Sequence, residues 1–449
     1  MHLAKLTMSR FLLVLFVVLG LQLTSNAQDQ SPYSRYGLGD VAPKGNVFSR
    51  GMGGISGAIS DLQNINLVNP AALGAIRYTI FDMGMEANVR TLKNTVPAKK
   101  STSYNAIFSY LQLAFPVAPS KLVKKGMYWN MSFGIKPVTR IDYNIENSQR
   151  LPGVDSIKSL YNGTGGVNQI NLGNALEFEG DTSKGQKFRI GFNFGYMFGT
   201  KNYSTKISMV NDTVDYYRSN SENNTHFGGL FFNAGFQFDT RFAKGLLSLG
   251  VYGNLQQRLN AKQDYVRETF SYDATGATYT VDSVYKQNDV KGTIVFPSTI
   301  GFGFAYQKHN WLVGGDMEFT NWANYTFYRQ TDAVQNSWTA RIGAQYTPDL
   351  KQGWSFKRNF FRTWMYRAGA YYGPDYVKVT ATRPAYGVTA GASIPLLRPS
   401  AYKPETATLH IGIDVGGRGD KNVNLRETIM RYSVGISMNA LWFRKPKYD

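Results

Sequence analysis

Side chains that could carry out acid–base chemistry are scarce in this sequence. Among four histidines, His410 lies in a stretch where polar and apolar residues alternate, and Asp414 has the same parity. A strand would place both on one face, where a His–Asp pair could assist proton transfer. No recognisable motif places a serine beside them. We therefore interpret His410 as a polar wall residue rather than as a catalytic base.

Metal and phosphate chemistry lack their usual patterns as well. The chain has no cysteine, and no dense cluster of His, Asp and Glu shows metal-ligand spacing. The glycine-rich runs Gly51–Gly54 and Gly416–Gly417 lack the strand-then-helix context of a phosphate loop. We expect no metal, no cofactor and no enzymatic activity.

The first residues indicate export. Lys5 and Arg10 precede an apolar stretch, Phe11–Leu23, and small residues end at Ala27, so cleavage before Gln28 is expected. A transmembrane anchor is the alternative, but the apolar run is short for a helix that must span a bilayer. No later stretch has 18 consecutive apolar residues, which excludes a helical inner-membrane protein.

The net charge of +19 is spread along the chain. Lys and Arg recur at expected turns and strand ends instead of forming one block, so nucleic acid is not expected as a partner. Contact with anionic lipid headgroups or acidic partners fits this distribution. A plain solvated surface explains it equally well.

Alternation with a period of two dominates the rest of the chain. In residues 81–90 and 188–198, apolar side chains alternate with polar residues or glycine over runs longer than soluble strands usually reach. This length and pattern predict strands that cross a membrane, with the apolar set outward and the polar set in a lumen. We expect 14 strands, near 78–92, 102–117, 126–142, 166–179, 187–200, 223–239, 245–259, 290–306, 310–326, 336–347, 362–373, 384–396, 406–418 and 429–443.

The connections between these strands suggest an orientation. Residues 143–165, 201–222 and 260–289 would be long external loops, the last with a hairpin around Asp273–Gly276. The internal links at 118–125, 180–186, 240–244 and 307–309 are short, as expected for a bacterial barrel. Aromatic residues near strand ends, Trp322 and Tyr325 among them, could form interfacial girdles.

The expected organisation is therefore a signal peptide at 1–27, a segment without strand pattern at 28–77, a transmembrane antiparallel β-barrel at 78–443 and a short periplasmic tail at 444–449. The 28–77 segment carries apolar residues that need burial, so we expect it to fill the lumen as a hatch. The last strand ends near Phe443 and resembles the signal that the barrel-assembly machinery reads during biogenesis. These features predict an outer-membrane location in a Gram-negative bacterium.

Several short motifs resemble the FadL/TodX family of outer-membrane transporters of hydrophobic compounds. They are Arg50–Gly54 followed by Asn69–Ala71, Phe296–Pro297, Gly301–Gly303, Asp316 with Trp322 and Tyr325, Arg341–Tyr346, and Arg367–Gly369. The resemblance implies a 14-stranded barrel plugged by an N-terminal hatch. It also implies diffusion of hydrophobic molecules through the lumen to a gap in the wall beside a kinked third strand. The opening Ser31–Asp40 departs from the fatty-acid transporter, which indicates a divergent branch.

Gating residues are expected at two places. The hatch would contribute Phe48, Met52, Gly53, Gly54, Asn69 and Pro70, and the third strand would contribute Gly134 and Pro137. Proline lacks the ladder donor and glycine packs no side chain, so strand pairing should fail there. The alternative is a strand that simply ends at Lys136.

Two functions remain open at this point. The first is passive, hatch-gated transport of a hydrophobic, fatty-acid-like molecule with lateral exit into the outer-membrane lipid. The second is a non-transporting, PorV-like barrel that binds protein partners through its external loops, as a component of a secretion or assembly complex. An open porin is disfavoured because residues 28–77 should plug the pore.

Overall fold

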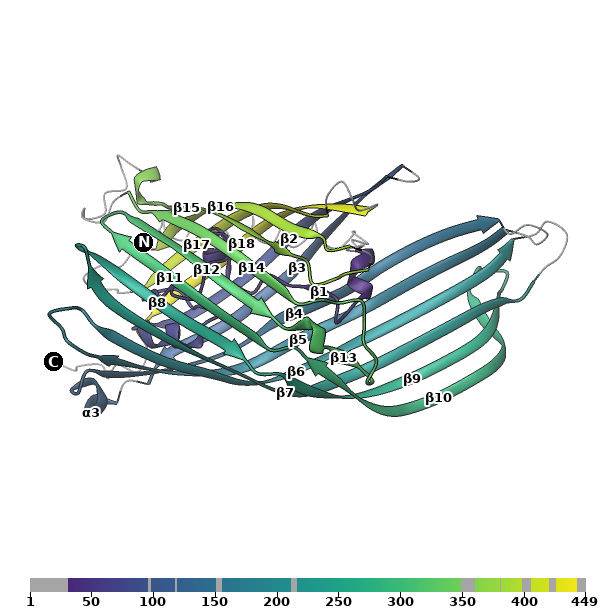
Figure 1. The fold of residues 1–449 in the computed structure, drawn as a ribbon, viewed down its shortest axis with the longest axis horizontal. Helices are drawn as coiled ribbons and strands as arrows, with labels where there is room; N and C mark the ends of the chain where they lie inside the picture. The colour runs from purple at the N-terminus through teal and green to yellow at the C-terminus, as the bar shows by residue number, and fades with distance from the viewer. Residues whose placement is uncertain are drawn as a thin grey trace, which may run out of the picture.

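The computed structural model describes residues 31–95, 98–117, 119–150, 156–210, 216–348, 360–379, 381–397, 405–419 and 425–441 (Figure 1). The expected signal peptide, the tail 444–449 and the aromatic end at Phe443 lie outside these residues. No helix among the described residues is long and apolar enough to cross a membrane.

The described chain forms a closed, 14-stranded antiparallel β-barrel, which confirms the expected fold class and strand count. Each strand pairs with the next along the chain, and the last strand pairs with β2 to close the ring. The wall strands are β2 (Thr79–Asn94), β3 (Lys99–Pro116), β4 (Met127–Arg150), β5 (Ser156–Glu179), β6 (Lys187–Val210), β7 (Arg218–Phe242), β8 (Gly245–Asn254) continued by β9 (Gln257–Tyr272), β10 (Thr278–Phe296) continued by β11 (Thr299–Lys308), β12 (Trp311–Thr320), β14 (Ser337–Tyr346), β15 (Met365–Pro374), β16 (Pro384–Leu397), β17 (Thr406–Arg418) and β18 (Leu425–Ala440).

Short elements complete the fold. Inside the barrel lie η2 (Pro32–Arg35), β1 (Asp40–Val41), α2 (Val47–Arg50) and η3 (Pro70–Ala75). The connections carry α3 (Ser120–Val123), η4 (Trp322–Asn324), β13 (Thr326–Phe327) and η5 (Phe360–Thr363).

The alternation has the predicted sense. On β2 the inward side chains of Asp82, Glu86 and Arg90 are buried, whereas the outward Met85 is exposed. The outward aromatic and aliphatic residues of β6, from Phe188 to Tyr196, are exposed in the same way. An outer surface of exposed apolar side chains suits contact with lipid, because charged side chains cost little only in the lumen.

The three expected external loops are not loops, and this prediction was wrong. Residues 143–150, 156–165, 201–210, 218–226, 261–272 and 278–291 extend β4, β5, β6, β7, β9 and β10 well beyond the other strands (Figure 1). We call this extension the arm. The alternation of polar and apolar residues in the arm differs from that in the barrel, because the arm does not face lipid. A search for the barrel pattern therefore did not reveal the strands of the arm. The hairpin turn at Asp273–Gly276 is confirmed at its tip.

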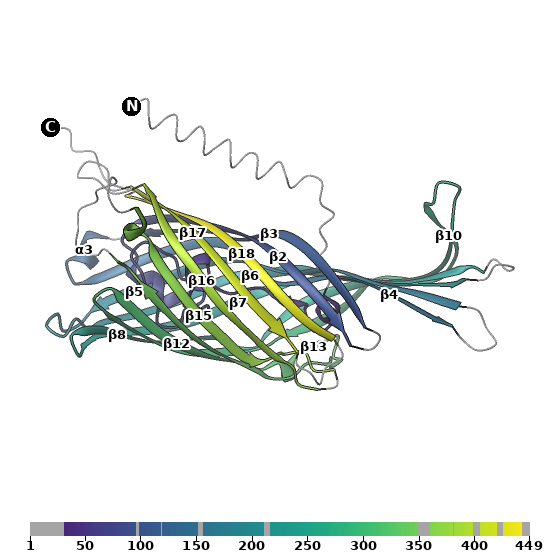
Figure 2. The same cartoon turned by 90° about the horizontal axis from the view of Figure 1, so that it is seen from above.

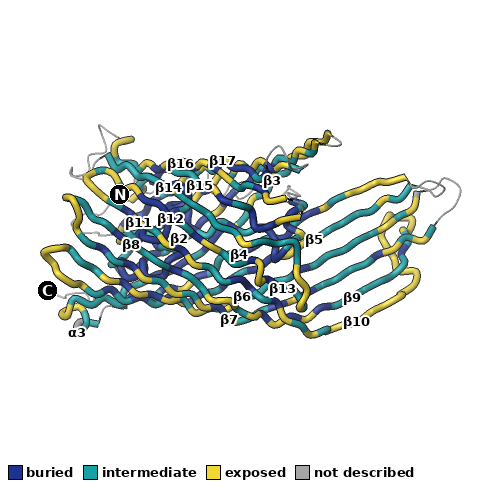
Figure 3. Tube along the Cα trace, viewed as in Figure 1, coloured by how far each residue is buried: buried dark blue, intermediate teal, exposed yellow. Residues whose placement is uncertain are grey.

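In β4, β5 and β6 the arm reverses the polarity of the barrel wall, whereas β7 and β9 keep polar residues such as Ser219, Ser221 and Arg267 on the lumen-side face. Its outer face carries Asn144, Glu146 and Lys158, whereas Ile145, Tyr161 and other apolar residues share the face that continues the lumen side; the other apolar residues are Tyr143, Ile157, Tyr203, Ile207 and Met209. Figure 3 shows the arm mostly exposed or half-buried. A polar outer face is expected for strands that stand in water rather than in lipid.

A seam interrupts the wall between β3 and β4. The two strands pair only from Leu111 opposite Ile135 to Pro116 opposite Asn130. Beyond Ile135, β4 keeps its pairing with β5, with an irregularity between Pro137 and Thr139, but its other edge pairs with β1 of the lumen segment. The alternative in which the strand ends at Lys136 is therefore wrong.

Disulfide trapping would test the seam, since the chain has no native cysteine. Leu113→Cys with Phe133→Cys joins two residues that face each other in the ladder, so we expect complete cross-linking under mild oxidation. Ile107→Cys with Thr139→Cys would face each other only if the same register continued, and we expect no cross-link. Equal cross-linking of both pairs would show a continuous wall.

Candidate functional site

The N-terminal segment (residues 31–77) lies inside the barrel (Figure 2), and hydrogen bonds join it to strands on several sides. Arg50 donates to Glu86 on β2 over 2.6 Å, and Asp316 on β12 accepts from the Ser56 and Gly57 N–H groups at 2.5 and 2.8 Å. On β4, Asn130 donates to the Leu73 carbonyl over 2.7 Å. Buried backbone groups need such partners, because water does not reach them.

Wall glycines make room for this segment. A Cβ on Gly343 or Gly369 would lie 2.3 Å from the backbone of Met52 and Gly53, and one on Gly250 would lie 2.0 Å from the Gly57 carbonyl oxygen. Gly191, Gly235 and Gly303 touch the segment in the same manner. Glycine lets two backbones approach closely, so these inward positions fix where the segment rests.

Buried charges hold the part of the N-terminal segment around Asp40, which we call its outer end. Asp40 forms ion pairs with Arg418 at 2.6 Å and with Arg90 at 2.9 Å, and both arginines also pair with Glu427. Burial alone would raise the pKa of Asp40, but the two guanidinium groups outweigh it and lower that pKa below its ordinary value. Asp40 therefore stays ionised at neutral pH.

Aromatic side chains line the same outer end. The Tyr325 hydroxyl donates to the Gly37 carbonyl over 3.0 Å, and the Tyr376 hydroxyl donates to the Gly39 carbonyl over 2.6 Å. Trp322 stacks on Tyr376 with ring centroids 4.3 Å apart. Trp322 and Tyr325 are buried, so the prediction that they belong to an interfacial girdle was wrong. They pack against the N-terminal segment instead, a long-range contact that sequence position alone does not reveal.

The first four predicted gating residues lie together inside the lumen. Phe48 is buried, with Arg367 3.9 Å above its ring and His410 at its edge. Gly53 and Gly54 have φ angles of 70° and 82°, a conformation that favours glycine, and the Gly53 N–H donates to Thr389 over 2.7 Å. Met52 is fully buried beside them.

Asn69 and Pro70 lie at the other end of the segment. The Asn69 side chain accepts from the Ala71 N–H, which caps η3, and donates to the Gly57 carbonyl over 2.6 Å. Pro70 is the first residue of η3, and its carbonyl lies against Gly191 on the wall. Both residues therefore shape and seat the segment.

Gly134 and Pro137 border the seam. Gly134 still pairs with β3, where the Gln112 side chain covers it, and pairing on that side stops after Ile135. Two neighbours were missed in the sequence: Arg140 reaches across the seam to Glu86 at 2.7 Å, and Lys136 donates to the Leu67 carbonyl over 2.9 Å. Among the described residues, no carboxylate lies within ion-pair distance of Lys136.

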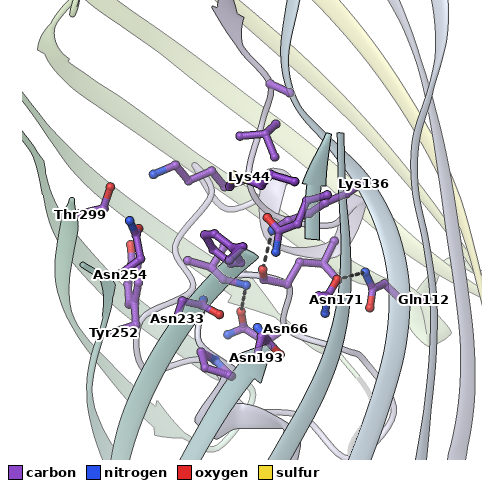
Figure 4. Close-up of a pocket in the computed structure, with 18 of the residues that line it drawn as sticks. Lys44, Asn66, Gln112, Lys136, Asn171, Asn193, Asn233, Tyr252, Asn254 and Thr299 are labelled. Carbon is purple, nitrogen blue, oxygen red and sulfur yellow. Dashed lines mark hydrogen bonds between the residues drawn. The ribbon is translucent and has the colours of Figure 1, made fainter. Parts of the chain in front are cut away.

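The described residues enclose two cavities in the lumen, and both touch Val41, Ala42 and Lys44. The smaller, of about 110 Å³, lies beside the seam and is bordered by Lys136, Pro137 and several amide side chains (Figure 4). The amides are Asn66, Gln112, Gln169, Asn171, Asn193, Asn233 and Asn254. The larger, of about 290 Å³, is lined by eight charged wall and segment residues, which are Lys44, Arg50, Arg341, Arg418, Arg431, Glu318, Asp375 and Asp414. The smaller cavity is also lined by apolar side chains, among them Leu67, Phe231 and Phe296. The charged lining of the larger cavity suits water better than a hydrocarbon.

His410 does not pair with Asp414. Its Nδ1 atom lies 2.5 Å from the Ser393 hydroxyl oxygen, and Arg367 donates to the same hydroxyl over 2.6 Å. Asp414 instead accepts from Arg431 and Tyr371. Ser393 and His410 are both buried, so a solute in the cavities does not reach this pair. No group of three His, Asp or Glu side chains in the described ranges could hold a metal ion.

Comparisons with solved structures define the class of fold. A FadL homologue from Pseudomonas aeruginosa superposes with a TM-score of 0.54 at 12% identity, covering 89% of this chain and 99% of that one. The toluene transporter TodX of P. putida gives a TM-score of 0.54 at 13% identity, covering 90% of this chain and 100% of that one. The toluene transporter TbuX of Ralstonia pickettii gives a TM-score of 0.52 at 12% identity, covering 90% of this chain and 99% of that one. The chain thus has the fold of the FadL-type outer-membrane barrels.

The sequence family is narrower than the fold. The profile of the BamG family matches residues 8–449, and the chain belongs to that family. No curated protein sequence matches the chain.

Proposed function

We propose that this barrel is a partner-binding component of an outer-membrane assembly complex, with no catalytic step of its own. The observation that carries the proposal is the arm, a six-stranded sheet that stands beyond the barrel. On its lumen-side face, η2 contacts Tyr161 and Tyr203 at the base. Further out, four apolar residues have no covering element among the described residues; they are Ile145, Ile157, Ile207 and Met209. Sheet of this kind usually serves protein contact, since exposed apolar surface is otherwise unfavourable. Membership of the BamG family agrees with a role in assembly.

The lumen supports the same proposal because its filling disfavours the passage of a hydrophobic solute. Polar contacts tie the N-terminal segment to β2, β4, β12 and β16, which supports a role as a hatch. A hydrophobic solute would have to displace these contacts and then cross the charged walls of the larger cavity. The interior is therefore poorly suited to solute permeation. A rigid, filled barrel can instead anchor the projecting sheet of the arm.

A shortened arm tests the proposal. In this variant a two-residue Asn-Gly turn replaces residues 145–161, so that Asn144 and Asn162, which face each other in the ladder, end a normal hairpin. We expect the barrel to assemble, because the membrane part is untouched, but expect co-purifying outer-membrane proteins to fall at least roughly tenfold. Heat-modifiable electrophoretic mobility serves as the folding control. Unchanged partner recovery from a folded variant would contradict the proposal.

Lateral transport is the second candidate, favoured by the position of the smaller cavity beside the seam. There β1 occupies the edge of β4 that β3 leaves free, so displacement of β1 would connect the cavity to the bilayer. Phe48, Met52, Gly53, Gly54, Asn69 and Pro70 would gate the lumen, and Gly134 and Pro137 the lateral exit. Lys136 would favour an amphipathic, fatty-acid-like cargo with a negative head.

A further inference from the structure

We infer that the free edge of β4 in the arm, Asn144–Arg150, is a strand-addition site that binds an extended segment of another outer-membrane polypeptide. The inference rests on the proposed partner-binding function and deepens it by naming the site. It is carried by the direction of the backbone hydrogen-bonding groups, by the difference between this edge and the other free edges, and by the contact that already occupies its lower part.

The direction of the backbone groups follows from the contacts just below the site. The Val138 carbonyl accepts from the Ala42 N–H, and Asp142 exchanges hydrogen bonds with Ser31 and Ser34 of the N-terminal segment. Residues two apart on a strand point their backbone groups to the same side. The N–H and C=O groups of Asn144, Glu146, Ser148 and Arg150 therefore continue this row, and no backbone partner meets them in the described part of the chain.

The other free strand edges carry features that oppose strand addition, and the Asn144–Arg150 edge of β4 does not. The β10 edge has three register irregularities between Thr280 and Val290, and Figure 2 shows that end turned away from the rest of the arm. The β3 edge begins with Lys99 and Lys100. Bulges and lysines are the usual protection of an edge against added strands. Along Asn144–Arg150 there is no proline, no lysine and no register irregularity.

The lower part of the same edge already binds an added strand. β1 pairs antiparallel with β4 at Arg140 and Thr139, so the geometry of the edge is suitable for addition. A segment that continued this row would place alternate residues beside Ile145, which favours apolar side chains there, and an acidic residue opposite Arg150. Seven residues of edge span about 20 Å, the length of an ordinary strand.

Two other occupants from this chain match the edge less well. If cleavage falls before Gln28 as expected, only Gln28–Gln30 precede Ser31, and three residues are too few to cover the edge. A second copy in the same membrane points its β4 in the same direction, so it could pair only in parallel, whereas the strand β1 already on this edge is antiparallel. A segment of a different polypeptide is the remaining occupant.

Hydrogen exchange on the full-length protein tests the site. We expect the amides of Asn144, Glu146 and Ser148 to exchange at least about tenfold more slowly in isolated outer membranes than in detergent-purified protein, because a partner strand would protect them. Ser148→Pro removes one free-edge donor but no bond to β5, and an edge strand accepts proline. We expect it to abolish the protection of Asn144 and Glu146, whereas Ser148→Ala keeps it. A cysteine-directed photo-crosslinker on Ser148→Cys should yield an adduct with a different polypeptide.

Three results would overturn the inference: equal exchange in membranes and detergent, protection that persists in Ser148→Pro, or a cross-link only to a second copy of this chain. Partner recovery measured on the same samples separates the two proposals. Retained partners with an unprotected edge would leave the partner-binding function standing and remove the β4 site. Absence of both partners and protection would remove both.

Discussion

The double variant Gly343→Ala with Gly369→Ala is expected to displace the hatch and open the lumen. Each new Cβ would lie 2.3 Å from the backbone at Met52 or Gly53, and no flexible side chain end is available to move away. Overpacking typically costs about 1–3 kcal/mol per site. Since Gly53 already uses a left-handed turn to approach the wall, the segment has no easy local adjustment.

Single-channel conductance in planar bilayers measures this effect. We expect the variant to conduct at least roughly tenfold more than the wild-type protein, because a 14-stranded lumen without its hatch holds water. Gly412→Ala is the matched control, since its Cβ would meet neighbours only at 3.7 Å or beyond. Equal, low conductance of all three proteins would show that the glycine contacts do not seat the hatch.

Glu177→Gln is expected to give the largest loss of stability among single substitutions. The Glu177 side chain is fully buried between Arg189, at 2.5 Å, and Arg77, which ties it to the N-terminal segment. Arg189 would keep only Asp239 as a charged partner. Removing one partner from a buried ion pair costs several kcal/mol, so we expect a loss of about 3 kcal/mol.

Guanidinium unfolding in detergent, followed by tryptophan fluorescence, measures this loss. Asp289→Asn is the control, because it makes the same acid-to-amide change in the exposed pair with Lys262 and should cost less than about 0.5 kcal/mol. The asparagine also tolerates the positive φ of 57° at that position. Equal unfolding midpoints for the two variants would show that the Glu177 network contributes little.

The barrel was predictable from sequence because its physical cause is local and repeated. Apolar residues such as Phe192 and Phe194 must face lipid, and their inward neighbours must not, so alternation reveals each strand and the count of 14. Pro137 similarly indicated the place where β3 and β4 separate, since a missing donor is visible in the sequence.

The arm was not predictable in this manner. Its strands have no lipid to impose a pattern, so residues 143–165 looked like a loop although they pair regularly from Tyr143 to Arg150. The sequence also did not reveal the contacts of the N-terminal segment. The wall glycines Gly343 and Gly369 are two of 45 glycines, and only the fold shows which of them meet the backbone of that segment. Likewise, only the fold shows that Arg140 and Lys136 lie at the seam.

Native mass spectrometry on the wild-type protein, gently extracted from its own outer membrane, tests the central claim most directly. A partner-binding barrel should be detected with other outer-membrane proteins in fixed stoichiometry and with no small molecule retained in the lumen. A monomeric barrel that carries an acyl-chain-sized ligand and no protein partner would contradict the claim and favour lateral transport through the seam.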